Sequence, residues 1–105
     1  MMPVPPQRVQ EVAKSALKRR RDIAPSKRGG TAVGIARARD LSLGKNITLN
    51  TIRRMISFFA RHNTVAERRN RRNDRNSRAA IAWDLWGGNP GRKWAESVNK
   101  RLSDA

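Results

Sequence analysis

Short apolar stripes at helical spacing, separated by capping residues and glycines, constrain this chain more than any other feature of its sequence. The clearest stripe follows Thr48, which is a suitable N-cap residue, and Ile47 and Ile52 lie at the two positions of a hydrophobic staple. Its members follow the i, i+3, i+4, i+7 pattern of a buried helix face: Ile52, Met55, Ile56 and Phe59. The sequence therefore predicts an amphipathic helix that begins after Thr48.

Two helices are predicted before this one. The first carries apolar residues at helical spacing between the proline pair at positions 5–6 and about Arg21. The second lies between Thr31, a suitable N-cap, and Gly44, which is a favourable residue just past a helix C-terminus. The segment between them contains a proline and two glycines, so we expect a loop there.

Two more helices are predicted towards the C-terminus. The first has Ser77 as its N-cap and ends at Gly87-Gly88, and the second has Asn89 as its N-cap with Pro90 at its first position. The three tryptophans of the chain all fall in these two helices: Trp83, Trp86 and Trp94. Because the chain has only two phenylalanines and no tyrosine, we expect these rings to form the core in preference to stacking on bases.

The chain has 105 residues, of which 37% are hydrophobic, so one small core and one domain are expected. We predict an all-α fold in which residues 1–105 form a single bundle of about five short helices after a tail at residues 1–7. The helices on either side of Gly44 are compatible with a variant helix-turn-helix or with a plain helical hairpin. A turn about two residues longer than in the usual motif is needed to keep Ile52 and Met55 in the core.

The segment 63–77 has a different composition, since it consists largely of arginine and asparagine. It offers almost no apolar side chains for a buried stripe. Two interpretations remain open: the segment extends the preceding helix as a charged rod, or it is a linker that becomes ordered on a polyanion.

The charge balance indicates the partner class. The chain has 24 basic and 8 acidic residues, which gives a formal net charge of +16, and 18 of the basic residues are arginine. Such a charge destabilises a compact state unless a polyanion neutralises it, and the arginine fork suits phosphate groups. Nucleic acid is therefore the expected partner, with DNA preferred, although arginine-rich segments of this kind also bind RNA.

Three groups of residues are candidates for nucleic-acid contact. The face opposite the stripe of the helix after Thr48 presents Asn50, Arg53, Arg54, Ser57 and Arg61. The arginine-rich segment adds Arg68, Arg69, Arg71, Arg72 and Arg75, and the end of the first helix adds Arg19, Arg20 and Arg21. The alternative for each group is an ordinary solvated surface.

Several other classes of function are disfavoured. The chain has no cysteine and one histidine, and its acidic residues are scattered, so we expect no metal site, no cofactor and no enzyme activity. The glycines at 29–34 are not followed by the Lys-Ser/Thr of a P-loop, and we expect no small-molecule substrate. No apolar run approaches the length of a membrane span, so no membrane association is expected.

Three blocks of the sequence resemble a small domain family of tailed bacteriophages: GGTAVGIARARDL at 29–41, TIRRMISFFARH at 51–62 and IAWDLWGG at 81–88. The resemblance covers about residues 8–98, and members of the family are sometimes encoded near head-morphogenesis or prohead-protease functions. In that family a segment with glycine and proline usually follows the Arg-His pair, whereas here the segment is rich in arginine and asparagine. The resemblance implies a phage setting but no catalytic residues.

Together these features predict a phage-encoded, strongly basic, non-enzymatic protein that binds nucleic acid by neutralising phosphates. The alternative is a structural protein of the virion, associated with the capsid or head, whose basic surface faces packaged DNA or an acidic protein partner such as a phage head protein. The expected location is the host cytoplasm during infection or the interior of the virion.

Overall fold

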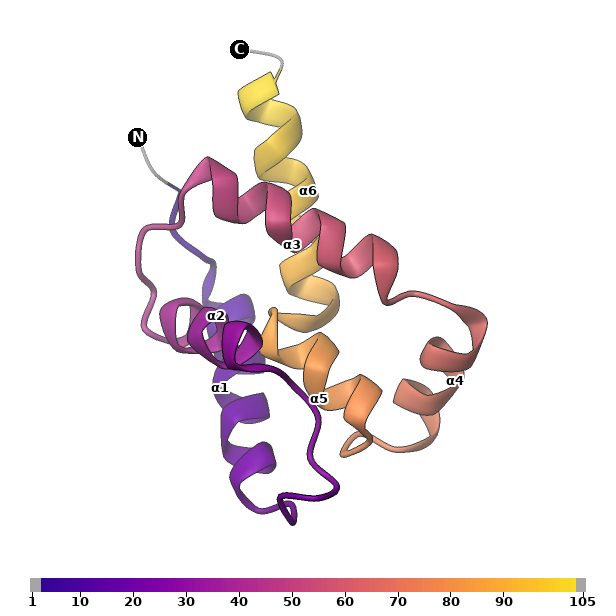
Figure 1. The fold of residues 1–105 in the computed structure, drawn as a ribbon. Coiled ribbons are helices and arrows are strands. Elements are labelled where there is room, and N and C mark those ends of the chain that lie inside the picture. Colours follow the sequence, from indigo (N-terminus) through magenta and orange to yellow (C-terminus); the bar gives the residue numbers. More distant parts are fainter. Residues whose placement is uncertain (1–2, 104–105) are drawn as a thin grey trace.

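The computed structural model describes residues 3–103, which contain six helices and no strand (Figure 1). The helices are α1 (Gln7–Arg21), α2 (Ala32–Ser42), α3 (Leu49–Arg61), α4 (Val65–Asn73), α5 (Arg78–Leu85) and α6 (Gly88–Ser103). The pair α1 and α2 packs together, α3 crosses α6, and α5 contacts α1, α2, α4 and α6. The predicted all-α class and small bundle are therefore confirmed.

Three helices begin where their capping residues predict. The side chains of Thr31, Thr48 and Ser77 each accept a hydrogen bond of 3.1 Å from the backbone amide three residues later. This bond satisfies one of the amide groups that a helix N-terminus leaves without a partner. The predicted starts of α2, α3 and α5 are confirmed.

The N-terminal stretch packs against the body. Residues 1–2 of the predicted tail 1–7 lie outside the described residues, and α1 begins at Gln7. Pro5 is buried, and its carbonyl oxygen accepts a hydrogen bond of 2.8 Å from the Gln10 side chain. The backbone amide of Ile47 donates a 2.8 Å hydrogen bond to the carbonyl of Pro3, so residues 3–6 also hold the loop before α3.

Aromatic rings join α3 to α5 in the core. Phe58 stacks on Trp86 with ring centroids 4.6 Å apart, and Phe59 meets Trp83 edge-on at 4.7 Å. Both tryptophans are buried, as predicted, and Trp94 is partly buried against the same cluster. The predicted stripe of α3 needs one correction, because Phe58 is buried whereas Ile56 is only partly buried.

The corner between α5 and α6 differs from the prediction at Asn89. Helix α6 begins at Gly88, so Asn89 lies within its first turn and is not its N-cap. The Asn89 side-chain oxygen instead accepts a hydrogen bond of 2.9 Å from the indole nitrogen of Trp83. The chain can turn this sharply because Gly87 and Gly88 adopt positive φ angles of 100° and 62°, which glycine adopts at little cost.

Both interpretations of the helices on either side of Gly44, a variant helix-turn-helix and a plain helical hairpin, are wrong. Both motifs require the helices on either side of the turn to pack against each other. Here α2 packs chiefly against α1, and α3 packs chiefly against α6. The contact between α2 and α3 is slight and includes a 3.5 Å hydrogen bond from the Arg37 side chain to the Thr51 hydroxyl. The N-terminal stretch holds the loop between them, and α2 and α3 pack against different neighbours.

The segment 63–77 is neither a linker nor an extension of α3. It contains a separate helix, α4, whose N-terminus is closed by a capping box between Thr64 and Glu67. The Thr64 hydroxyl accepts from the Glu67 amide at 3.1 Å, and the Glu67 carboxylate accepts from the Thr64 amide at 3.2 Å. This reciprocal pair starts a new helix immediately after the end of α3.

Candidate nucleic-acid interface

The outer face of α3 carries five of the predicted residues, and all five are exposed. They are Asn50, Arg53, Arg54, Ser57 and Arg61, and together with the start of α2 they line a shallow hollow of about 440 Å³. The side chains of Arg53, Arg54 and Arg61 make no hydrogen bond or ion pair with any other residue of the described range. Their charges are therefore available to a ligand.

The position of this face is determined by the opposite side of the same helix. Ile52, Met55, Phe58 and Phe59 are all buried, and the Thr48 cap holds the first turn. A helix anchored in this way presents its outer side chains from a fixed backbone, which favours defined contacts with phosphates and base edges.

Arg71 of α4 has a different environment from its neighbours. Its guanidinium carbon lies 3.7 Å from the centroid of the Trp83 ring. The same group donates hydrogen bonds of 2.9 Å to the His62 carbonyl and to the Asn63 side chain. Burial lowers the pKa of Arg71 from its ordinary value. Arg71 therefore attaches α4 to α5 and to the end of α3. Its guanidinium group already contacts partners within the protein.

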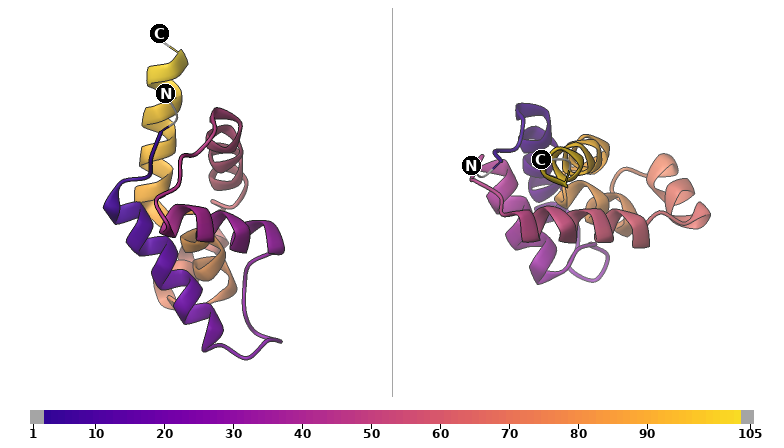
Figure 2. Two further views of the ribbon diagram at one scale, coloured as in Figure 1. Left: turned by 90° about the vertical axis from the view of Figure 1, so that its left-hand side faces the viewer. Right: turned by 90° about the horizontal axis from the view of Figure 1, so that it is seen from above.

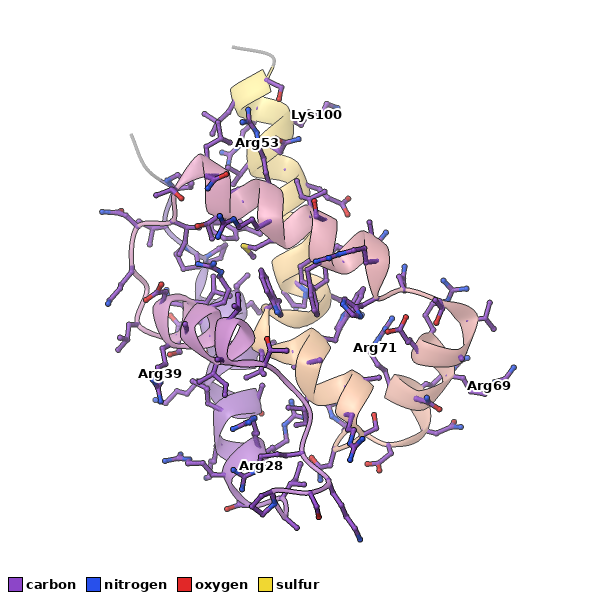
Figure 3. The ribbon with its side chains drawn as sticks, viewed as in Figure 1. Arg28, Arg39, Arg53, Arg69, Arg71 and Lys100 are labelled. Atoms are coloured by element: carbon purple, nitrogen blue, oxygen red, sulfur yellow. The ribbon has the colours of Figure 1, made fainter. Side chains whose placement is uncertain are left out.

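The other arginines of the predicted tract are exposed. Figure 3 shows Arg69 pointing away from the body while Arg71 turns towards it. Arg72 and Arg75 are also exposed, and Arg68 donates a 2.8 Å hydrogen bond to the Asn63 carbonyl. The tract thus provides a row of solvated cations beside one structural arginine.

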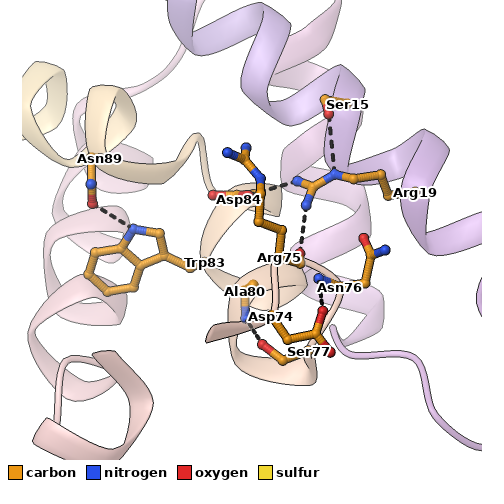
Figure 4. A network of polar contacts seen from close by, with 10 residues as sticks. All are labelled: Ser15, Arg19, Asp74, Arg75, Asn76, Ser77, Ala80, Trp83, Asp84 and Asn89. Atoms are coloured by element: carbon orange, nitrogen blue, oxygen red, sulfur yellow. Dashed lines mark hydrogen bonds and ion pairs between the residues drawn. The ribbon is translucent and has the colours of Figure 1, made fainter. Parts of the chain in front are cut away.

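The predicted cluster at the end of α1 is largely structural. Arg19 donates to Asp84 at 2.7 Å, to the Arg75 carbonyl at 2.6 Å and to Ser15 at 3.2 Å (Figure 4). Arg20 donates a 2.8 Å hydrogen bond to the carbonyl of Gly29. Arg21 is exposed. Arg19 therefore joins segments distant in sequence and Arg20 holds the loop after α1, while their contact with nucleic acid stays a prediction.

A larger concave surface, which we call the α4 groove, lies between α4 and the pair α1 and α6. Its volume is about 1070 Å³, and eight basic and three acidic side chains line it. One wall carries the α4 cations with Arg75, and the other carries Arg8 of α1 with Arg92 and Lys93 of α6. Two of the acidic residues are already paired, since Asp84 lies 2.7 Å from Arg19 and Glu96 lies 2.9 Å from Arg92.

Arg8, Arg92 and Lys93 are not among the candidates predicted from the sequence. They are isolated in the sequence or lie in an otherwise ordinary helix, and only the tertiary fold brings them opposite the arginines of α4. No local pattern indicates such a juxtaposition.

Glu67 connects the α4 cap to the end of α3. One of its carboxylate oxygens lies 3.1 Å from Nδ1 of His62, and the other accepts hydrogen bonds from the amide and hydroxyl of Thr64. Burial acts to raise the pKa of Glu67, but these hydrogen bonds from Thr64 and His62 outweigh it and lower the pKa below its ordinary value.

Within residues 3–103, no three His, Asp or Glu side chains gather as a metal site would require. In the same range no helix combines the length and the apolar character needed to cross a membrane. No protein-family model, curated protein or solved structure matches this chain.

Proposed function

We propose that this chain is a non-enzymatic protein that binds nucleic acid, preferably DNA, by neutralising phosphates. The observation that carries this proposal is the outer face of α3. It presents Arg53, Arg54 and Arg61 without intramolecular partners in the described range, from a helix whose opposite face is buried. Exposed cations on a fixed backbone are the arrangement that phosphate contact requires.

The overall charge supports the same proposal. A formal net charge of +16 on 105 residues produces strong self-repulsion, which a bound polyanion relieves. Few of the cations are neutralised internally: the described residues contain three ion pairs between an arginine or lysine and a carboxylate. Neutralising the remainder releases counterions from the nucleic acid, which is the principal source of sequence-independent affinity.

The proposed setting is a bacteriophage infection, with the protein in the host cytoplasm or inside the particle. The three sequence blocks that resemble a tailed-phage domain family support this setting. They also support a second candidate, a structural head protein whose basic surface faces packaged DNA or an acidic partner. Many ordered copies in purified particles would favour the structural role, and its presence only in infected-cell lysate would favour the DNA-binding role.

Two matched double variants test the proposal. Arg53→Ala with Arg54→Ala removes two charges from α3, and Arg69→Ala with Arg72→Ala removes two charges from α4. All four side chains are exposed, so both variants should retain the wild-type thermal melt. The α3 variant should bind duplex DNA more weakly and discriminate less between sequences. The α4 variant should weaken all sequences about equally and reduce the salt slope by roughly one per lost contact.

Two results for the α3 variant would contradict the proposal. If the α3 variant keeps full affinity and sequence preference, the outer face of α3 is not a contact surface. If it unfolds, these arginines belong to the scaffold and the proposed interface is wrong.

A further inference from the structure

The α4 groove has a shape that differs from that of the α3 face. The α3 face borders a shallow hollow of about 440 Å³ that is lined mainly by α3 and the start of α2. The α4 groove has a volume of about 1070 Å³, and its lining residues come mainly from α1, α4, α5 and α6. Its two walls face each other with cations on both sides, namely Arg68, Arg72 and Arg75 on one and Arg8, Arg92 and Lys93 on the other. A ligand in the groove would therefore meet positive charge on two sides at once.

We infer that the α4 groove binds one polynucleotide strand, as a site separate from the outer face of α3. The inference rests on the proposed function, because it assigns a form of nucleic acid to a second surface. It adds Arg8 and Lys93 as contact residues and places Arg72 in the groove, and all three are exposed without side-chain partners in the described range.

The shape favours a single strand over a duplex. A protein reads duplex DNA by inserting a convex element, such as a helix, into a major groove about 12 Å wide. The α4 groove presents the opposite curvature, and its volume of about 1070 Å³ accommodates a segment of strand between the walls. Proteins that hold single strands characteristically use a positively charged groove that follows the backbone.

The lining favours contact with the backbone over stacking of bases. Among the described residues, Trp83 is the only aromatic one that lines the groove. It is 3% exposed, and the Arg71 guanidinium lies over its ring. A base cannot stack on this ring while Arg71 remains in place. Seven of the eight basic side chains are arginines, whose planar forks suit phosphate oxygens. Binding in the groove should therefore depend on charge and show little dependence on sequence.

The test compares two triple variants with the same loss of charge. The groove variant carries Arg8→Gln, Arg72→Gln and Lys93→Gln. The control variant carries Lys27→Gln, Arg39→Gln and Arg101→Gln, whose side chains are exposed and line neither hollow. Each full-length protein is titrated with a labelled oligothymidine strand and with a duplex, both of about 20 units, at several salt concentrations around 100 mM.

We expect the groove variant to bind the single strand about tenfold more weakly than the control variant. The slope of log affinity against log salt should also be smaller by about two, because each of the three lost phosphate contacts contributes about 0.7 to this slope for a single strand. In the groove variant, duplex affinity should fall by a smaller factor than single-strand affinity, because among the three residues only Arg72 is also proposed to contact the duplex. Unlabelled polyglutamate of the same length should compete much less effectively than unlabelled oligothymidine.

Four results would overturn the inference. Equal losses in the two variants would show that only net charge matters, and effective competition by polyglutamate would assign the groove to an acidic polypeptide. Wild-type protein that binds the duplex but not the strand would refute the groove site and leave the proposed function intact. Wild-type protein that binds neither would refute both.

Discussion

Helices α3 and α4 follow each other in the chain, both begin at a threonine N-cap, and both carry several arginines, yet they are held in different ways. Helix α3 buries Ile52, Met55, Phe58 and Phe59 in the core. Among the described residues, helix α4 has no buried residue, packs chiefly on α5 and lies at the edge of the molecule (Figure 2). The comparison shows that arginine content does not determine how firmly a cationic surface is held, whereas an apolar stripe does.

The attachment of α4 depends on polar groups. An isolated helix shorter than about 12 residues is marginal in water, and α4 has nine. The capping box at Thr64 and Glu67 closes its start, and Arg71 attaches it to Trp83 and to the end of α3. We therefore expect α4 to open locally at lower free energy than α3, whose opening requires disruption of the core.

The largest contrast should come from removing one apolar side chain from each helix. Phe59→Ala deletes a ring that is 1% exposed, so the free energy of unfolding should fall by about 3–5 kcal/mol. Val65→Ala removes a side chain that is 62% exposed in α4 and should change it by less than about 0.5 kcal/mol. Urea denaturation measures both, and similar losses in the two variants would contradict the comparison.

Arg71→Ala tests the attachment of α4. The change removes the cation–π contact and two hydrogen bonds, which together should contribute about 1–2 kcal/mol to the docking of α4. The emission of Trp83 should shift to the red as the ring becomes exposed, and the amides of α4 should exchange faster. Arg72→Ala, which removes an exposed arginine from the next position, is the control and should change neither signal.

The two threonine caps allow the same substitution in both helices. Thr48→Ala and Thr64→Ala should each cost about 1 kcal/mol, because each removes the acceptor of an N-terminal amide. At Thr48 the loss should appear in global unfolding, since α3 is part of the core. At Thr64 it should appear mainly as faster hydrogen exchange within α4. A fully global loss at Thr64 would show that α4 unfolds only together with the core.

The smallest expected effect is a pH dependence of α4. The pKa of Glu67 is lowered in the folded protein, so its ionised form stabilises α4 above the ordinary glutamate pKa, and this contribution is lost as pH falls through the lowered value. The amide chemical shifts of α4 should therefore move towards unfolded values as the pH falls from about 6 to 3. The amide chemical shifts of α3 should change little over the same range. In Glu67→Gln this difference between the helices should disappear.

The parts of this fold that follow from local signals could be predicted from the sequence. The starts of α2, α3 and α5 depend on hydrogen bonds between Thr31, Thr48 or Ser77 and an amide three residues away, so a short window contains the whole interaction. The burial of Trp83 and Trp86 follows from the scarcity of other large apolar residues.

The remaining features depend on contacts between distant segments. Ile56 and Phe58 lie on opposite flanks of the α3 stripe, and Phe58 is the more buried because the Trp86 ring stacks on it. Arg19 forms an ion pair with Asp84, which lies 65 residues away in the chain. The local sequence around Arg19 therefore gives no indication of its structural role. The outer face of α3 could be predicted because it is one helix face, whereas the opposed walls of the α4 groove could not.

The salt dependence of DNA binding tests the central claim most directly. If the solvated arginines of α3 and α4 meet phosphates, about six contacts should make duplex affinity fall roughly 10³-fold between 50 and 200 mM salt. This titration needs only the wild-type protein and a short duplex. A steep linear dependence of log affinity on log salt is the predicted result. Affinity that stays nearly constant over this range would contradict the account, because the charge would then not act by releasing counterions from DNA.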